Sequence, residues 1–195
     1  MRTQRIILLV IIVFTSNIIL GQATDSLKNA MLEKIKSSEV FKETIYEFKG
    51  KELPKFELPL LSGKKINSES LKGKPTIINF WFSNCAPCIE EMPLLNEIKS
   101  EFGNEVNFIS MTFQNQNEVN EFLRTHDFDF THIVDSKDYI KTFGTFGYPK
   151  TLILDKDLVI VEIEKMIPKD TENEEKNKAE FKAQLSEKLN ELKKR

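Results

Sequence analysis

The sequence predicts an α/β fold with a mixed central sheet flanked by helices, an N-terminal β-hairpin, and helical extensions at both ends. Between residues 76 and 134, short apolar runs typical of strands buried on both faces alternate with amphipathic helical stretches. Two later apolar runs are separated only by Lys156-Asp157, which predicts an antiparallel hairpin. Parallel strands joined by helices and followed by an antiparallel pair form a mixed sheet with helices on both faces.

Length and composition limit the class of protein. The chain has 195 residues, which is the size of one domain with extensions. Hydrophobic residues make up 40% and charged residues 30%, which indicates a globular rather than a disordered chain. The formal net charge is -2 and no basic patch stands out, so nucleic acid is not an expected partner.

The N-terminus has the pattern of a secretory signal peptide. Two arginines precede the apolar run of residues 6–20, and the small residues Gly21 and Ala23 follow it. We therefore expect residues 1–23 to be a signal peptide and the protein to be exported, that is, periplasmic or otherwise extracytoplasmic. The alternative is an uncleaved membrane anchor formed by residues 6–20, and only then is contact with the membrane expected.

Residues 24–53 are polar and charged, and we expect them to form an N-terminal extension of the domain. Apolar residues recur on one side of Asp25–Lys36, which predicts that the extension is helical in part. The domain itself is expected to span residues 54–195 and to include a C-terminal helix. It opens with Phe56–Ile66, in which two extended runs flank Ser62-Gly63 and predict the β-hairpin.

Apolar runs and helical spacing predict the remaining elements in order. Strands are expected at Thr76–Phe82, Val106–Phe113, Ile133–Val134, Thr151–Asp155 and Leu158–Met166. Helices are expected from the cysteines to Phe102, over residues 115–127, at Asp138–Phe143, and over residues 171–195. Asn115, with Glu118 three positions later, predicts a capping box at the start of the second helix.

The chain contains two cysteines, Cys85 and Cys88, which directly follow the first buried strand. Such a pair occurs as a redox couple, as half of a metal site, or as a structural staple. A bridge between them closes so small a loop that it constrains the unfolded chain very little, which argues against the staple. Because disulfides form and persist outside the cytosol, the expected export favours the redox couple.

The predicted strand–turn–helix context also favours redox chemistry. Cys85 is expected at the helix N-terminus, where unpaired backbone N–H groups and the helix dipole favour a thiolate. Pro87 suits the first helical turn, because the N–H that proline lacks would have no partner there. Cys88 lies one turn inside, so we expect an exposed nucleophile followed by a buried thiol that can attack a mixed disulfide.

Three stretches carry a family resemblance. Residues 79–93, NFWFSNCAPCIEEMP, follow the pattern N-F-W-x-x-x-C-x-x-C-x-x-E-x-P; Leu71-Lys72-Gly73-Lys74 precedes them and Gly147-Tyr148-Pro149 lies downstream. Over roughly Pro54 to Met166, the chain resembles the thioredoxin-fold superfamily and, within it, the exported branch similar to TlpA and ResA. The resemblance implies a thioredoxin-like fold and a thiol–disulfide oxidoreductase.

The resemblance also implies roles for individual residues. It implies Cys85 as the nucleophile, Cys88 as the resolving thiol, and Glu91 as an acidic residue that influences their pKa values and proton transfer. It implies that Pro149 is a cis-proline whose loop faces the disulfide and pairs with bound polypeptide. Tyr148 either lines this binding groove or packs internally, and Trp81 either packs in the core or forms a platform for the substrate.

The chain departs from the family pattern at three positions, one of which is Asn84, where a tryptophan often precedes the first cysteine. Asn79 stands where cytosolic thioredoxins carry a buried aspartate, a departure that the exported branch shares. Lys150 follows the cis-proline position, where threonine is usual. A lysine there could stabilise a thiolate or attract an acidic partner, so Lys150 and Pro87 are candidates for tuning the couple.

Metal binding and peroxidase chemistry are alternative functions. Cys85, Cys88, His126 and His132 could supply four ligands, but the separation between the cysteines and the histidines far exceeds that in compact zinc sites. We expect both histidines on surface loops. A Cu(I) carrier that uses the two thiolates is a second alternative. Thiol peroxidases of this fold carry threonine or serine three residues before the reactive cysteine, where this chain has Phe82.

The expected function is that of an exported thiol–disulfide oxidoreductase with no metal and no cofactor beyond its Cys85–Cys88 disulfide. The dipeptide Ala86-Pro87 contains no histidine or other cation that would stabilise a thiolate further, which favours a reductase over a disulfide oxidant. The expected partners are cysteine-containing exported proteins and a membrane or periplasmic thiol–disulfide electron donor.

Overall fold

The structure is a computed structural model that describes Lys28, residues 43–168 and residues 172–194. The chain divides into two units, Met1–Lys42 and Glu43–Arg195. All helices and strands named below belong to the second unit, which contains the cysteine pair.

Two predictions concern the first unit. The signal peptide expected at residues 1–23 lies outside the described residues, and so does the helix expected at Asp25–Lys36 except for Lys28. In the part of the chain that the structure describes, no helix is both long enough and apolar enough to cross a membrane.

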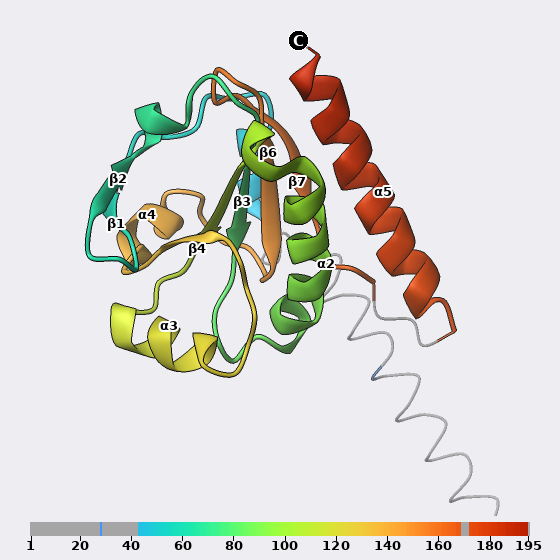
Figure 1. Cartoon of the computed structure of the whole chain (residues 1–195), viewed down its shortest axis with the longest axis horizontal. Helices are drawn as coiled ribbons and strands as arrows, with labels where there is room; N and C mark the ends of the chain where they lie inside the picture. Colours follow the sequence, from blue (N-terminus) through green and yellow to red (C-terminus); the bar gives the residue numbers. More distant parts are fainter. Residues whose placement is uncertain (1–27, 29–42, 169–171, 195) are drawn as a thin grey trace, which may run out of the picture. The chain divides into compact units, whose positions relative to one another are not determined.

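A five-stranded mixed sheet forms the centre of the second unit, in the order β5-β4-β3-β6-β7 (Figure 1). Its strands are β3 (Thr76–Phe80), β4 (Asn107–Met111), β5 (Thr131–Ile133), β6 (Lys150–Leu154) and β7 (Ile160–Glu164). β3 is parallel to β4, and β4 to β5, whereas β6 is antiparallel to both of its neighbours. The predicted α/β class and mixed sheet flanked by helices are confirmed.

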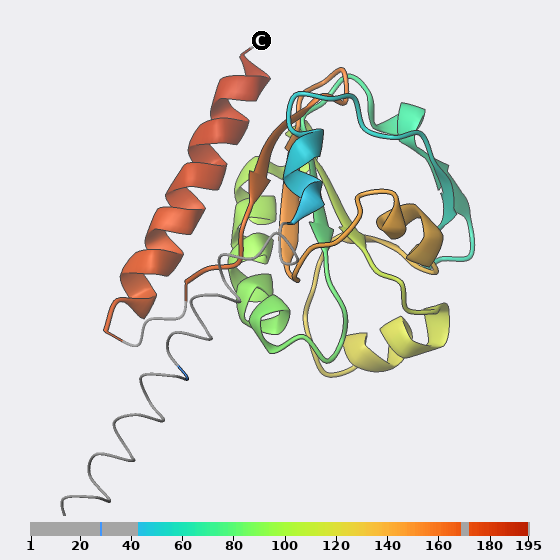
Figure 2. The same cartoon turned by 180° about the vertical axis from the view of Figure 1, so that it is seen from behind.

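Alternation along the strands divides the core into two layers. The helices that cover the sheet are α2 (Ala86–Phe102), α3 (Gln116–Leu123), α4 (Lys137–Lys141) and α5 (Glu174–Lys193). On β3, Ile77 joins the layer that contains residues of α2, α3 and α5, while Ile78 and Phe80 join the layer that contains residues of α4. Figures 1 and 2 show α2 and α5 together on one side of the sheet.

The predicted hairpin consists of β1 (Glu57–Pro59) and β2 (Lys65–Asn67), which pair antiparallel. Gly63 in its turn has a φ of 82°, a conformation that glycine adopts without strain. Past β1 the chain reaches the main sheet, where the Leu61 N–H donates to the His132 carbonyl oxygen at 2.9 Å. The hairpin therefore covers part of the β5 edge, which would otherwise expose unpaired backbone groups.

The helix α3 begins with the capping box that the sequence predicts. Asn115 Oδ1 accepts the Glu118 N–H at 3.1 Å, and Glu118 Oε2 accepts the Asn115 N–H at 2.8 Å. The two side chains thus satisfy backbone donors that the first helical turn leaves without a partner.

The last hairpin has a longer turn than the two residues predicted. Asp155 Oδ1 accepts the N–H groups of Asp157 and Val159 at 3.0 and 2.9 Å, and Leu158 has the positive φ of 66°. These bonds form a turn around Leu158, so β7 begins at Ile160 rather than at Leu158.

Residues 43–53, which were expected to form an extension, pack as part of the domain. They contain the short helix η2 (Thr44–Phe48), whose Ile45 side chain is 0% exposed in the layer of α4. Leu53 lies in the same layer with 2% exposed. The compact unit therefore begins at Glu43. The apolar residues of this segment, Ile45, Tyr46, Phe48 and Leu53, are too few and too unevenly spaced to define a helical or strand period, so the sequence does not predict this packing.

The C-terminal helix α5 is part of the core through residues such as Leu185, which is 0% exposed. We expect Leu185→Ala to lower the free energy of unfolding by about 2–5 kcal/mol, because the missing methyl groups leave a cavity. Gln184→Ala, at the exposed neighbouring position, should change it by less than about 0.5 kcal/mol. Urea unfolding followed by circular dichroism measures both, and equal stability of the two variants would contradict this packing.

Candidate active site

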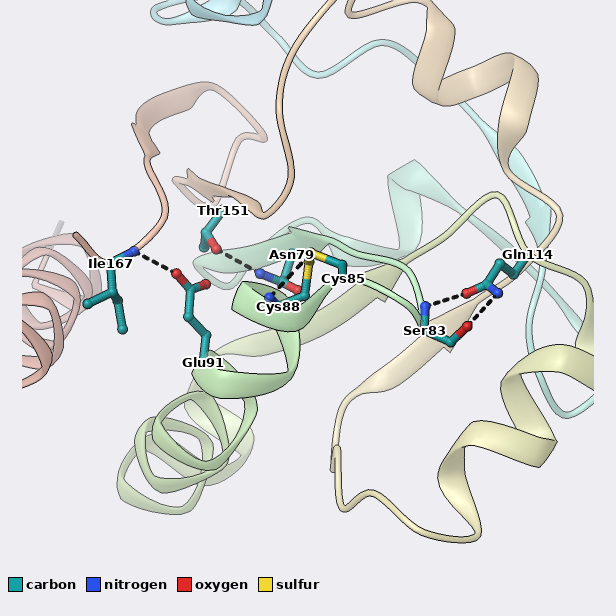
Figure 3. The surroundings of a disulfide bond; sticks show 8 residues. All are labelled: Asn79, Ser83, Cys85, Cys88, Glu91, Gln114, Thr151 and Ile167. Atoms are coloured by element: carbon teal, nitrogen blue, oxygen red, sulfur yellow. Dashed lines mark hydrogen bonds between the residues drawn. A yellow bond between two sulfur atoms is a disulfide. The ribbon is translucent and has the colours of Figure 1, made fainter. Parts of the chain in front are cut away.

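The two cysteines form a disulfide where the chain passes from β3 to α2 (Figure 3). Cys85 is the N-cap residue of α2, with extended backbone angles of φ −93° and ψ 94°. Its Sγ accepts a hydrogen bond from the Cys88 N–H, with 3.3 Å between sulfur and nitrogen. Pro87 lies in the first helical turn. The sequence-predicted strand–turn–helix placement of the pair is therefore present.

Both cysteines are buried, with 4% of Cys85 and 2% of Cys88 exposed. The expectation that Cys85 is exposed is wrong for this disulfide-bonded form. Cys85 and Cys88 belong to one core cluster, and the partly buried side chains of Phe82 and Tyr148 pack against that cluster. Because the surroundings are apolar, a thiolate at this position depends on nearby N–H donors for its stability.

Gln114 holds the loop that leads into the disulfide (Figure 3). Its Oε1 accepts the Ser83 N–H at 2.7 Å, and its Nε2 donates to Ser83 Oγ at 2.8 Å. Gln114 follows β4 and is 8% exposed, so this pair of bonds ties residues 81–85 to the end of the neighbouring strand. Sequence reasoning missed this contact, because the two residues are 31 positions apart, Ser83 stands at a variable position of the cysteine motif, and Gln114 lies outside that motif.

Asn79 occupies the buried position on β3 that is acidic in cytosolic thioredoxins. It is 2% exposed, and its Nδ2 donates to Thr151 Oγ1 on β6 at 3.0 Å (Figure 3). An amide does not titrate, so Asn79 cannot accept a proton from a thiol. In Figure 3 the carboxyl group drawn near the cysteines is that of Glu91.

Glu91 lies three residues after Cys88 on α2 and is 2% exposed. Its Oε1 accepts the Ile167 N–H at 2.8 Å (Figure 3). Burial raises the pKa of the carboxyl group to about 7, against the opposing effects of the Ile167 N–H and the charge of Lys150. A carboxyl group with a pKa near neutrality can both accept and release a proton at physiological pH.

The Tyr148–Pro149 peptide bond is cis, as the family resemblance implies. Pro149 is buried and immediately precedes β6. Tyr148 is half-buried and meets the ring of Phe82 edge-on, with 5.3 Å between ring centroids. Phe82 lies three residues before Cys85, so this contact places the cis-proline loop beside the loop that carries the disulfide.

Lys150 is buried, with 5% exposed, and its Nζ lies 3.1 Å from Glu43 Oε1. The suggestion that it attracts an acidic partner is wrong, because the ammonium group lies inside the protein and already has a carboxylate beside it. Its charge acts within the site, where it opposes the rise in the pKa of Glu91. Sequence reasoning found Lys150 but missed Glu43, whose only signal is its charge.

Trp81 is a core residue. It is 0% exposed, and its ring packs on Phe122 and Phe128 with centroid distances of 4.9 and 5.7 Å. The alternative role as a platform for the substrate is wrong, because the side chain presents no surface to a bound molecule.

The two histidines contact aromatic side chains of the core layer that contains residues of α3. His126 follows α3 and stacks on Phe122 with 4.2 Å between ring centroids. His132 is not on a surface loop as expected: it lies on β5, its Nδ1 is hydrogen-bonded to Ser110 Oγ at 2.5 Å, and burial lowers its pKa to about 4. Within the described residues, no cluster of three or more His, Cys, Asp or Glu side chains could hold a metal ion.

Known proteins resemble this chain in both sequence and fold. A model of the AhpC/TSA family matches residues 49–163. The chain is 32% identical over 118 residues to the thioredoxin-like protein YneN of Bacillus subtilis, across 58% of this chain and 69% of that protein. It is 34% identical over 116 residues to the thiol-disulfide oxidoreductase ResA of Bacillus cereus, across 58% of this chain and 67% of that protein.

Solved structures share the fold at lower identity. A thiol:disulfide interchange protein from a Bacteroides species superposes with a TM-score of 0.60 at 18% identity, over 73% of this chain and 90% of its own. A thioredoxin family protein from Chlorobium tepidum superposes with a TM-score of 0.58 at 20% identity, over 73% and 95%. These likenesses confirm that the fold is thioredoxin-like.

The raised pKa of Glu91 predicts how stability changes with pH. The folded protein binds this proton more tightly than the unfolded chain, whose glutamate has a pKa of 4.5. The stability that protonation contributes is therefore complete below about pH 4.5 and is lost as the pH rises through about 7. We expect Glu91→Gln, which keeps an acceptor for Ile167, to be more stable than the wild type by up to about 3 kcal/mol at about pH 8.

Urea unfolding of the disulfide-bonded protein at several pH values measures this effect. Near about pH 4 the variant and the wild type should have similar stability, because both side chains are neutral there. Glu101→Gln, at an exposed position of the same helix, is the control and should follow the wild type. A Glu91→Gln variant whose stability parallels that of the wild type across this range would show that the carboxyl group titrates normally.

Proposed function

Because the chain belongs to the AhpC/TSA family and is a thioredoxin-like thiol–disulfide oxidoreductase, we propose that it reduces disulfides of exported proteins through Cys85 and Cys88. The observation that carries this proposal is the placement of the cysteine pair. Cys85 caps α2 and receives the Cys88 N–H on its sulfur, beside a loop with a cis-proline. An amide donor at the sulfur favours a thiolate, and a second thiol one turn away can resolve a mixed disulfide, so the pair is suited to thiol–disulfide exchange.

Cys85 attacks first in the proposed reaction. In the reduced protein, the N-terminal end of α2 and the Cys88 N–H favour the thiolate of Cys85. This thiolate attacks one sulfur of the substrate disulfide, so that a new S–S bond forms to Cys85 and the S–S bond of the substrate breaks. The released substrate thiolate takes up a proton.

Cys88 then resolves the mixed disulfide. It loses its proton, attacks Cys85 Sγ, and releases the second substrate thiolate, which is protonated in turn. Two electrons and two protons thus pass from the dithiol of the protein to the substrate disulfide. Glu91 accepts the proton of Cys88 in this scheme, because it lies on the same helix and its pKa of about 7 leaves carboxylate available at neutral pH.

The proposal includes a compartment and two partners. The signal-peptide pattern of residues 1–23 supports export, and disulfide-bonded substrates are common outside the cytosol. The substrates are cysteine-containing exported proteins. After each turnover, a dithiol protein in the membrane or the periplasm reduces the Cys85–Cys88 disulfide again, and the reaction needs no further cofactor.

The variant Cys88→Ser tests the order of attack. It keeps the attacking thiol and removes the resolving one, so we expect it to accumulate a covalent adduct with a disulfide-containing protein such as insulin. The adduct should be visible by mass spectrometry and should disappear on treatment with dithiothreitol. Turnover of insulin reduction should fall by at least about a hundredfold.

Cys85→Ser is the matched control, because it removes the other sulfur and should form no adduct. Adducts that form through Cys88 instead would reverse the assigned roles. A reduced wild-type protein that leaves insulin intact would contradict the proposed reaction. Binding of Cu(I) or reduction of hydrogen peroxide by that protein would then identify the carrier or the peroxidase.

A further inference from the structure

The carboxylate of Glu43 contacts both ends of the cis-proline loop. Its Oε1 accepts the Gly147 N–H at 2.6 Å and lies 3.1 Å from the Nζ of Lys150. Gly147 and Lys150 flank Tyr148-Pro149 on either side, so a single oxygen atom bridges the segment that contains the cis bond. A Cβ atom on Gly147 would lie 3.2 Å from this oxygen, which shows how closely the two segments approach.

Thr44 holds the stretch of chain just before this loop. Its N–H donates to the Thr145 carbonyl oxygen at 3.0 Å, and its Oγ1 accepts the Thr145 N–H at 3.0 Å. The same Oγ1 donates to the Phe143 carbonyl oxygen at 3.1 Å. Two consecutive residues, Glu43 and Thr44, therefore fasten the connection between α4 and β6.

The burial of Lys150 favours the ion pair between Glu43 and Lys150. Lys150 is 5% exposed, and a buried ammonium group is costly unless a carboxylate accompanies it. Burial acts to raise the pKa of Glu43, but the Gly147 N–H and Lys150 outweigh it and hold the pKa below its usual value. Glu43 is therefore a carboxylate at neutral pH, and its bonds to the loop are charge-assisted.

We propose that Glu43 is a positioning residue, which holds the backbone around Pro149 in the orientation needed to pair with a polypeptide substrate. This inference rests on the proposed function, because it concerns how that same site recognises its substrate. Glu43 bonds to Gly147 and Lys150, not to the cysteines, and acts through the loop. It therefore determines how well protein disulfides are recognised and leaves the reactivity of the Cys85 sulfur unchanged.

Comparing a protein disulfide with a small disulfide separates the recognition of the substrate from the reactivity of the Cys85 sulfur. In the proposed reaction, a protein disulfide is presented on an extended segment that forms main-chain hydrogen bonds with the loop, and such bonds contribute affinity. Dithiodipyridine is a small disulfide with no peptide backbone, so it reports only on the attacking sulfur. The ratio of the two reaction rates therefore measures what the loop contributes.

The first experiment compares pre-reduced wild-type protein with Glu43→Gln, using insulin and dithiodipyridine in single-turnover reactions. We expect the second-order rate constant with insulin to fall about tenfold, which is the scale of one lost charge-assisted hydrogen bond. The rate constant with dithiodipyridine should stay within about twofold. Glu57→Gln removes a carboxylate that lies 2.9 Å from Lys65 on the exposed hairpin, and this control should change neither rate.

Thr44→Val is a second variant that leaves every charge in place. It removes the side-chain bonds to Phe143 and Thr145 and should show the same selective loss with insulin. Hydrogen exchange gives a readout that is independent of the reaction. In Glu43→Ala, which unlike Glu43→Gln removes the acceptor altogether, the Gly147 amide should exchange at least about tenfold faster than in the wild type, while the Val134 amide, bonded to the Pro59 carbonyl oxygen, should be unaffected.

The outcomes distinguish this inference from the proposed function. Equal loss with both disulfides would mean that Glu43 supports the fold in general, and unchanged rates with both would mean that it supports nothing the reaction uses; either result overturns the inference alone. A wild-type protein that reacts with neither disulfide would overturn the proposed function and this inference with it.

Discussion

The strand β3 pairs with β4 on one side and with β6 on the other, and the position of the active site depends on this pairing. Because β4 runs parallel to β3, the loop that carries Gln114 and the loop that carries the disulfide both follow the carboxyl ends of their strands, at the same end of the sheet. Because β6 is antiparallel, its first residue lies at that end too: Phe80 is opposite both Met111 and Lys150. Three segments that are distant in the sequence therefore meet where α2 begins.

The same region contains buried ionisable groups, whose charged forms are costly in a protein interior. Glu91 and Lys150 are 2% and 5% exposed, and an isolated charge at such depth would destabilise the fold. Glu91 avoids this cost below its pKa of about 7, where it holds a proton, and Lys150 reduces it by pairing with Glu43. Buried ionisable groups of this kind concentrate at functional sites, and here they flank the cysteine pair and the cis-proline loop.

The sequence predicted the structural features that depend on residues close together in the chain. The apolar runs predicted the strands, the Asn115 capping box predicted the start of α3, and the CxxC spacing predicted a disulfide at a helix N-terminus. Contacts between distant segments were not predictable, which is why Gln114 and Glu43 were missed. Burial was also misjudged for Cys85 and His132, because distant segments contribute to their surroundings: Tyr148 packs against the core cluster that contains Cys85, and the rings of Trp81 and His132 lie 6.3 Å apart between centroids.

The redox potential of the Cys85–Cys88 couple tests the central claim most directly. The protein is equilibrated in defined thiol–disulfide buffers, its free thiols are alkylated, and the oxidised fraction is measured by mass spectrometry. We predict a single reversible two-electron transition near the thioredoxin value of about −270 mV, which suits a reductant. A transition near about −120 mV would mark a disulfide oxidant, and the absence of any reversible transition would contradict the redox role itself.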